Sequence, residues 1–317
     1  MIKLALILME SNYTKLMDYN TIRERARPIN TIVSCSAMVI STIAIFLGLI
    51  LLFIITKKKW SKLYIDLKLV SMTVFVDLLV SIWAIVNSVL DLTNKIDYIG
   101  SQVGCTISGA ISIIISTGTI NCVAVTAIER YALIVLEASI SDHLYYFILF
   151  GFVLTNILSC AITIVLKGFT PHPTSIYCMN DLQTSAGRIG LGFLGFSEML
   201  SLVMVYFCYI SIILARRRLA LQAKEEFPMQ FQNIDINWKS TVFKASLIII
   251  GSTLSNVPYI IISTIWLARY ELYTSVLDGI ATLCLILNSI FNTFLILGMQ
   301  PDLSKEFKSC LKNFFFK

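Results

Sequence analysis

Charged residues are scarce in this chain of 317 residues, where Asp, Glu, Lys and Arg together make up 14%. Soluble domains carry about 25% charged residues. The scarcity therefore argues against a water-soluble globular protein of this length. Hydrophobic residues supply 57% of the chain and the mean hydropathy is +0.81, so a lipid bilayer is the solvent that the composition favours.

Signatures of enzymes are missing as well. The chain has no nucleophile–base pair, no glycine-rich phosphate loop and no His/Cys set at metal-ligand spacing outside the apolar stretches. It also lacks internal repeats and low-complexity tracts, which favours one domain. Nucleic-acid binding has no support beyond the net charge of +6. We therefore expect neither an enzyme nor a nucleic-acid-binding protein.

Long apolar runs fill most of the chain, and each is long enough to cross a bilayer as a helix. Only helices or a closed barrel satisfy backbone groups in lipid, and the short alternating segments of a barrel are missing. We predict an all-α membrane protein, a seven-transmembrane helix bundle. The apolar residues 1–9 are too short for a removable signal peptide, so the first span is expected to direct insertion. The predicted spans are 31–56, 63–90, 103–136, 144–166, 188–215, 241–268 and 272–298.

The distribution of lysine and arginine predicts the orientation, because positive residues gather on the cytoplasmic side. They favour an extracellular N-terminal segment over 1–30, a membrane domain over 31–298 and a cytoplasmic tail over 299–317, although Arg23, Arg25 and Arg27 before the first span oppose this. The inner basic face would attract anionic lipids. Its residues are Lys57, Lys58, Lys59, Lys62, Arg216, Arg217, Arg218, Lys224, Lys239, Lys305, Lys308, Lys312 and Lys317.

Two modifications are candidates at the ends of the chain. Asn12 begins the acceptor Asn12-Tyr13-Thr14 on the expected outer side, where glycosylation is allowed. Cys310 in the tail is a candidate for palmitoylation, with an unmodified thiol as the alternative. The tail itself is predicted to be an amphipathic interfacial helix. Its apolar residues at helical spacing are Leu303, Phe307, Cys310, Leu311 and Phe314.

Cys105 and Cys178 are expected on the outer side, one at the start of the third span and one before the fifth. The outer side is oxidising, so we expect a disulfide that ties this connection to the third helix. The cysteines within spans are expected to be small apolar core residues. These are Cys35, Cys122, Cys160, Cys208 and Cys284.

Arg130 follows Cys105 by 25 residues in the third span. A helix of that length covers about 37 Å, more than the hydrocarbon core of about 30 Å. Cys105 and the triplet Glu129-Arg130-Tyr131 therefore lie at opposite faces of the membrane. A cysteine outside and a charged triplet inside on one helix are typical of a receptor that signals across the bilayer.

These residues and three further motifs resemble those of rhodopsin-like (class A) G-protein-coupled receptors, in the same order and on the matching spans. The resemblance implies a ligand-activated receptor of the plasma membrane that couples to a heterotrimeric G protein, with an arrestin-like protein as a second partner. The three motifs are Val76-Asp77-Leu78-Leu79, Asn256-Val257-Pro258-Tyr259, and Asn288-Ser289-Ile290-Phe291-Asn292 with the tail from Pro301.

The resemblance implies a polar pocket in the middle of the bundle that holds a sodium ion. An ionised Asp77 within the membrane needs partners from other helices. The alternative is a dry hydrogen-bond cluster that satisfies the same groups. The pocket residues would be Asp77, Thr119, Asn288, Ser289 and Asn292.

The resemblance also implies that Glu129 holds Arg130 at rest and that the released arginine contacts the G protein, supported by Tyr209. Interface charges near water and a tyrosine at the membrane boundary are the alternative interpretations. Pro258 removes a backbone hydrogen bond and is expected to kink the sixth helix, which could then move as a lever.

Several positions depart from the family pattern. Asn256 stands where the family usually has Trp, and Thr293 and Ile296 stand where it has Pro and Tyr. Trp238 occupies the position of the usual acidic tether to Arg130. A receptor-like scaffold that does not couple, and a seven-span transporter or channel with Asp77 on the ion path, remain alternatives.

Two missing residues narrow the class of ligand that the chain is expected to bind. The seventh span has no lysine, which argues against a retinal Schiff base, and Ser112 stands where amine receptors have Asp. His172 lies in a Pro-His-Pro turn and is expected to be a loop residue and not a metal ligand. A small neutral or lipid-like ligand is expected. The predicted cavity residues are Ser108, Ser112, Ser116, Phe193, Phe196, Tyr259 and Thr282.

Overall fold

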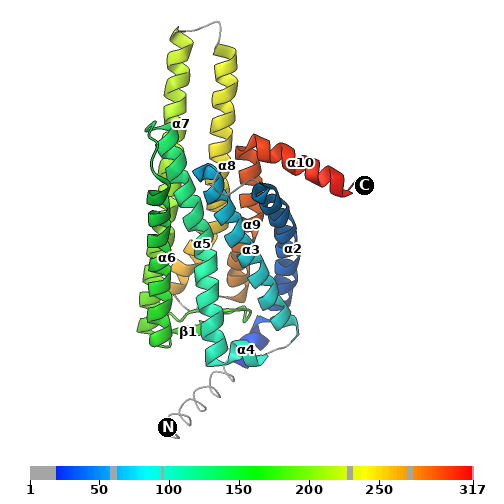
Figure 1. Cartoon of the computed structure of the whole chain (residues 1–317). Helices are drawn as coiled ribbons and strands as arrows, with labels where there is room; N and C mark the ends of the chain where they lie inside the picture. The colour runs from blue at the N-terminus through cyan, green and yellow to red at the C-terminus, as the bar shows by residue number, and fades with distance from the viewer. Residues whose placement is uncertain (1–18, 58–62, 94–95, 227–230, 270–273, 316–317) are drawn as a thin grey trace.

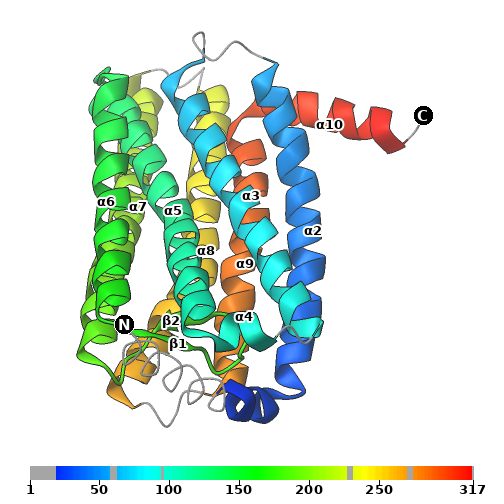
Figure 2. The ribbon, with the colours of Figure 1, turned by 60° about the horizontal axis from the view of Figure 1, so that its bottom comes forward.

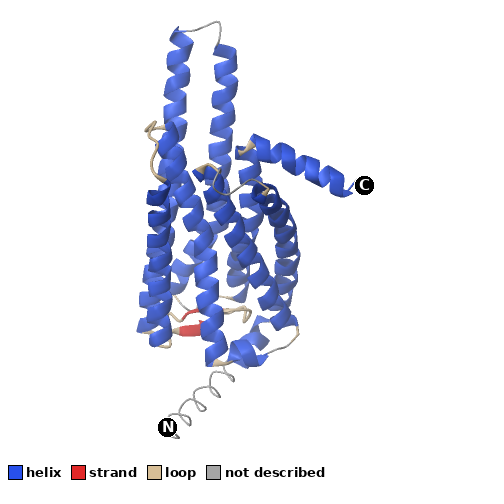
Figure 3. Cartoon of the chain, viewed as in Figure 1, coloured by secondary structure: helices blue, strands red, loops and turns tan. Residues whose placement is uncertain are grey.

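The computed structural model describes residues 19–57, 63–93, 96–226, 231–269 and 274–315. These residues are almost wholly helical (Figure 3). Seven helices are long and apolar enough to cross a membrane, which confirms the predicted seven-helix bundle. The seven are α2 (Ile29–Thr56), α3 (Ile65–Leu92), α5 (Gln102–Ile134), α6 (Asp142–Val165), α7 (Ser185–Glu226), α8 (Phe231–Ala268) and α9 (Ser275–Met299).

The seven helices form a closed bundle in which α5 packs against α3, α6 and α7 (Figures 1 and 2). Helix α9 completes the ring because it packs against α2, α3 and α8. The short helix α4 (Ile96–Gly100) precedes α5, and residues 19–26 form a helical segment before α2. Two strands, β1 (Phe169–Pro171) and β2 (Cys178–Asn180), pair antiparallel between α6 and α7.

The two ends of the bundle differ (Figure 2). One end carries α4, β1 and β2, and is called the lid end below. Helix α10 (Pro301–Phe315) leaves the opposite end, which is called the tail end. Leu303 and Phe307 of α10 are buried against Leu51, Ile54 and Ile55 of α2, so an apolar face holds the predicted C-terminal helix to the bundle.

Polar side chains join the helices within the bundle. Asn156 of α6 donates to Thr117 of α5 at 2.7 Å, and Ser201 of α7 donates to Asn121 of α5 at 2.7 Å. Lipid tails are as apolar as leucine, so close packing and hydrogen bonds, more than the hydrophobic effect, hold helices together in a membrane. These bonds therefore fix the neighbours of α5.

Helices α7 and α8 extend beyond the other helices at the tail end (Figure 1). The predicted spans end at residue 215 and resume at residue 241, but most of the stretch between them is also helical. Helix α7 continues to Glu226 and α8 begins at Phe231. The extension of α7 is rich in Ala, Leu, Arg, Gln, Lys and Glu, which are strong helix formers, so the helix continues past its apolar part.

Candidate ligand cavity and signalling site

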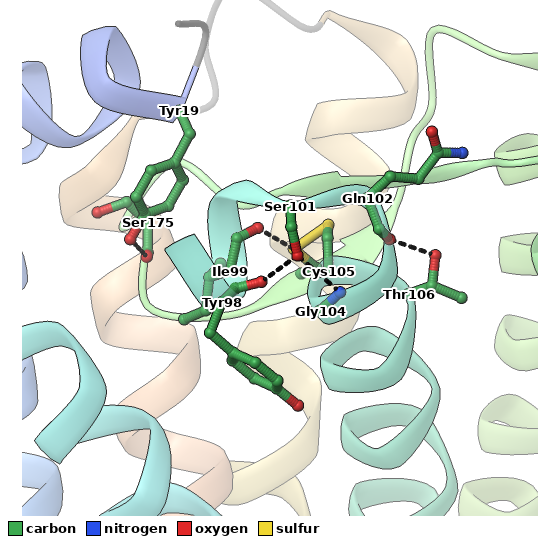
Figure 4. The surroundings of a disulfide bond; sticks show 10 residues. Tyr19, Tyr98, Ile99, Ser101, Gln102, Gly104, Cys105, Thr106 and Ser175 are labelled. Atoms are coloured by element: carbon green, nitrogen blue, oxygen red, sulfur yellow. Dashed lines mark hydrogen bonds between the residues drawn. A yellow bond between two sulfur atoms is a disulfide. The ribbon is translucent and has the colours of Figure 1, made fainter. Parts of the chain in front are cut away.

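The connection between α6 and α7 folds over the lid end as a β-hairpin, here called the lid (residues 169–180). A disulfide joins Cys178 of β2 to Cys105 in the first turn of α5, which confirms the predicted pairing (Figure 4). The lid lies so close to α5 that a Cβ on Gly109 would be 2.4 Å from the ring of Phe169. Glycine at this position therefore allows the close approach.

The carboxylate of Asp278, in the first turn of α9, holds the lid from the other side. It accepts hydrogen bonds from the backbone N–H of Thr174 at 2.9 Å, the Thr174 hydroxyl at 2.7 Å and the Tyr177 hydroxyl at 2.9 Å. Nδ1 of His172 lies 2.7 Å from the same carboxylate. Burial and the nearby negative charge raise the pKa of Tyr177 well above its usual value, so its hydroxyl keeps its proton.

The segment before α2 covers the lid. The buried hydroxyl of Tyr19 donates to the backbone carbonyl of Ser175 at 3.0 Å (Figure 4). Burial raises the pKa of Tyr19 to about 12. Arg23 forms a buried ion pair with Asp91 of α3, with 3.4 Å between Nε and Oδ1, and also donates to the Asp91 carbonyl. Two independent contacts thus fasten residues 19–26 across this end.

A cavity of about 90 Å³ lies beneath the lid. Four of the predicted cavity residues line it, namely Ser112, Ser116, Tyr259 and Thr282. The lid contributes Ile176, Tyr177 and Met179, and most of the remaining wall comes from α2, α3 and α9.

The other three predicted cavity residues do not line it. Phe193 and Phe196 of α7 are 41% and 64% exposed, while Leu194 and Ser197 of the same helix are buried. The rotation of α7 therefore turns both rings outward from the bundle. Ser108 is fully buried and is not part of the cavity wall. The cavity consequently lies closer to α2 and α3 than the sequence prediction placed it.

Asp77 connects three helices in the middle of the bundle. Its carboxylate accepts hydrogen bonds from Thr119 of α5 at 3.1 Å and from the Asn292 amide of α9 at 3.1 and 3.3 Å. Ser289 donates to the Asp77 backbone carbonyl at 3.5 Å. Asn288 is buried on the same helix, and its side chain makes no hydrogen bond with another described residue. The predicted polar cluster thus contains protein donors for both carboxylate oxygens.

Arg130 is held at the tail end chiefly by Asp66. Its guanidinium donates to Oδ2 of Asp66, at the start of α3, at 2.9 Å. Gln300, directly after α9, donates to the same oxygen at 2.7 Å. Glu129 lies 3.5 Å from Nε of Arg130, and its buried carboxylate accepts no hydrogen bond from the residues that the structure describes. The neighbour predicted to hold the arginine is therefore the weaker of its two partners.

A smaller cavity of about 40 Å³ opens beside Arg130 at the tail end. Tyr209 lines it together with Arg130, as the predicted support for the arginine requires. Tyr131 points elsewhere, because its ring packs against Phe207 of α7 with 5.6 Å between the ring centroids. Tyr131 therefore packs α5 against α7 and does not line this cavity.

Pro258 lies inside α8, where its missing N–H removes one backbone hydrogen bond. Asn256, two residues before the proline, is buried, and its amide donates to the carbonyl of Ser252 one turn earlier at 3.0 Å. Asn256 thus bonds within its own helix. Tyr259, next to the proline, lines the cavity beneath the lid, so the weakened turn of α8 adjoins that cavity.

A model of the seven-transmembrane receptor family of the rhodopsin type matches residues 47–295. The chain belongs to this family. It is a multi-pass membrane protein, and its family is one of receptors that signal through G proteins. Among curated proteins, none matches the receptor.

The receptor is also similar to a solved structure of squid rhodopsin. The TM-score is 0.69 and the sequence identity is 16%, over 89% of this chain and 85% of the squid protein. At that identity the similarity supports the fold alone. The helix order and the C-terminal helix of the receptor agree with that fold.

Sequence reasoning missed two carboxylates of the receptor. Asp66 is the main partner of Arg130, whereas the prediction looked for an acid on the sixth span. Asp278 was not singled out, and His172, expected as a loop residue, is buried against it. Each is an acid in the first turn of an apolar span, which was the available signal. The glycosylation candidate Asn12 and the side chain of Phe314 lie outside the described residues.

Proposed function

We propose that the receptor is activated by a small neutral or lipid-like ligand and transmits that signal to a heterotrimeric G protein by rearranging its helices. The observation that carries this proposal is the position of Arg130 at the wall of the tail-end cavity. Its ion pair with Asp66 is partly exposed, with side-chain exposures of 22% and 17%. An ion pair that is partly open to water costs less to separate than a fully buried one.

Helices α8 and α9 supply the connection between the two cavities. Tyr259 and Thr282 line the cavity beneath the lid, while Ile248 and Leu295 of the same two helices line the cavity beside Arg130. Gln300 follows α9 and shares the oxygen of Asp66 with Arg130. A ligand that binds one arrangement of α8 and α9 more tightly would shift the population of receptors toward that arrangement, and the tail end would change with it.

The proposed orientation places the lid end outside the cell, at the plasma membrane, and the tail end in the cytosol. The disulfide at the lid end fits an oxidising compartment. The tail end carries three exposed arginines on α7, Arg216, Arg217 and Arg218, which would attract acidic partners. A G protein, an arrestin-like protein and anionic lipids would all be attracted there.

Sodium binding at Asp77 is a separate part of the proposal. The carboxylate is buried among hydroxyl and amide groups, and an ion would neutralise it without a proton. Asp77→Asn is expected to remove any dependence of thermal stability on sodium, measured against potassium at equal ionic strength. If the melting temperature of the wild-type receptor is the same in both salts, the site binds no sodium and is only a hydrogen-bond cluster.

Nucleotide exchange on a co-expressed G protein tests the main proposal. Arg130→Ala is expected to abolish ligand-stimulated exchange while surface expression is unchanged. Arg188→Ala, which removes an exposed arginine at the lid end, serves as the matched control. Full exchange by the Arg130 variant would contradict the proposal. Ion flux in proteoliposomes that is lost with Asp77→Asn would instead favour the transporter.

A further inference from the structure

Two polar side chains of α3 face the cavity beneath the lid without hydrogen-bond partners among the described residues. Asn87 is 5% exposed and Ser88 is 1% exposed, and both line the cavity. Oδ1 of Asn87 and Oγ of Ser88 have no partner. A buried polar group without a partner is costly, so an occupant of the cavity is expected to satisfy both atoms.

The other polar side chains that line the cavity are already engaged. Nε1 of Trp83 donates to the hydroxyl of Ser112 at 2.9 Å, and Ser116 donates to the Ser112 carbonyl at 2.5 Å. Tyr177 bonds Asp278, and Thr282 donates to the Asp278 carbonyl at 2.8 Å. The Tyr259 side chain forms a hydrogen bond with Ser263. Asn87 and Ser88 are therefore the polar side chains of this wall that have no described partner and remain available to a ligand.

The distribution of charged residues around the cavity favours a neutral ligand. No charged residue lines the cavity within the described chain. Three acids near it are occupied: Asp91 by Arg23, Asp77 by Thr119 and Asn292, and Asp278 by the lid. A fourth, Glu198 of α7, lies near Tyr259 but does not line the cavity. A charged ligand would therefore lose its hydration without gaining a counter-ion.

The rest of the wall is mainly apolar, with Val33, Ala37, Val80, Ala84 and Ile286 around the polar pair. We propose that Asn87 and Ser88 recognise a hydroxyl group on an otherwise apolar, neutral ligand. The hydroxyl donates to Oδ1 of Asn87 and accepts from the hydroxyl of Ser88, so one group satisfies both atoms. This inference rests on the proposed function only in taking the cavity as the ligand site.

Two isomeric probes test the hydroxyl directly. Octan-1-ol and 1-methoxyheptane have the same atoms and similar apolar bodies, but only the alcohol can donate a hydrogen bond. Each competes with a photoreactive, diazirine-bearing alkanol for labelling of the purified full-length receptor, and mass spectrometry locates the adducts. Octan-1-ol is expected to protect peptides of α3 and α9 about tenfold more effectively, the effect of one hydrogen bond to a buried group.

Charged analogues and variants sharpen this test. Octanoate and octylamine are expected to protect those peptides less well than octan-1-ol. Ser88→Ala removes one unpartnered hydroxyl and no internal bond, so it should fold normally and reduce the difference between the isomers. Asn87→Leu together with Ser88→Ala should abolish it. Thr155→Ala, which removes an engaged hydroxyl from α6 outside this cavity, is the control that should preserve it.

Equal protection by the two isomers in the wild-type receptor would overturn the inference, and so would adducts that form only outside the cavity. Both results would mean that water alone satisfies Asn87 and Ser88. The readout is binding and not signalling, so the inference and the proposed function can fail separately. Arg130→Ala should leave isomer discrimination intact even though it abolishes nucleotide exchange.

Discussion

Two carboxylates hold the two ends of the bundle, and they do so in different ways. Asp278 at the lid end is fully buried, and three lid residues, His172, Thr174 and Tyr177, make four close contacts with its carboxylate. Asp66 at the tail end is partly exposed and binds two side chains, Arg130 and Gln300, through one oxygen.

The difference shows which end of the receptor is built to stay closed. Separating the lid from Asp278 would leave several buried polar groups without partners, which is strongly unfavourable. Separating Arg130 from Asp66 frees two charged groups that are partly open to water, which costs less than separating a fully buried pair. A disulfide reinforces the lid end, whereas a cavity adjoins the arginine. Movement is therefore expected at the tail end.

The largest effect is expected from Asp278→Ala. Removal of one partner from a buried, hydrogen-bonded charged cluster costs about 3 kcal/mol or more. The free energy of unfolding should fall accordingly, measured as a lower melting temperature of the purified receptor. Asp302→Ala removes an exposed carboxylate from α10 and should leave the melting temperature unchanged. Equal melting temperatures for the two variants would refute the strong attachment of the lid.

A methyl group placed under the lid should have the next largest effect. Gly109→Ala puts a Cβ 2.4 Å from the Phe169 ring, and overpacking of this kind costs about 1–3 kcal/mol. Gly151→Ala on α6 is the matched control, because nothing lies within 4 Å of the added Cβ. Because alanine favours a helix more than glycine does, the control should be more stable by up to about 1 kcal/mol. Changes of the same sign in both thermal melts would contradict close packing of the lid.

Asp66→Asn should raise basal nucleotide exchange without ligand. It weakens the ion pair of Arg130 by about 1 kcal/mol, which corresponds to about a fivefold shift in population toward the released arginine. The control is Asp142→Asn, which breaks the 2.7 Å ion pair between Lys68 of α3 and Asp142 of α6 and leaves Arg130 untouched. Basal exchange that rises equally in both variants would show that charge loss alone is responsible.

Glu129→Gln should produce the smallest effect. The Glu129 carboxylate lies beside Arg130 but accepts no hydrogen bond within the described part of the chain, so its replacement removes less from the resting state than loss of Asp66 does. Basal exchange should therefore increase less than with Asp66→Asn, assayed in the same membranes. A larger increase with Glu129→Gln would contradict this ranking and would mean that Glu129, not Asp66, is the main partner of Arg130 at rest.

The main features of the fold follow from the sequence because hydropathy depends on local composition. All seven spans, the pairing of Cys105 with Cys178, and the grouping of Asp77 with Thr119 and Asn292 are found as predicted. The outward rotation of Phe193 and Phe196 was not predictable, because α7 is apolar on nearly every side and its sequence does not reveal which face packs inward.

The partners of Arg130 and His172 were missed for a different physical reason. Asp66 precedes Arg130 by 64 residues and Asp278 follows His172 by 106 residues. Such contacts depend on how the helix ends are placed against one another, which local pattern does not determine. A polar residue near a helix end also has an ordinary explanation, contact with water at the membrane boundary, so the sequence alone favoured that interpretation.

Distances between spin labels at the two ends test the central claim most directly. One pair is placed at Tyr64 and Phe243 near the tail end, and the other at Leu92 and Val276 at the lid end, all exposed positions. Binding of nucleotide-free G protein should lengthen the first distance by several ångströms, about one helical turn at most, and leave the second unchanged. An unchanged tail-end distance, or a lid-end distance that changes as much, would contradict the account.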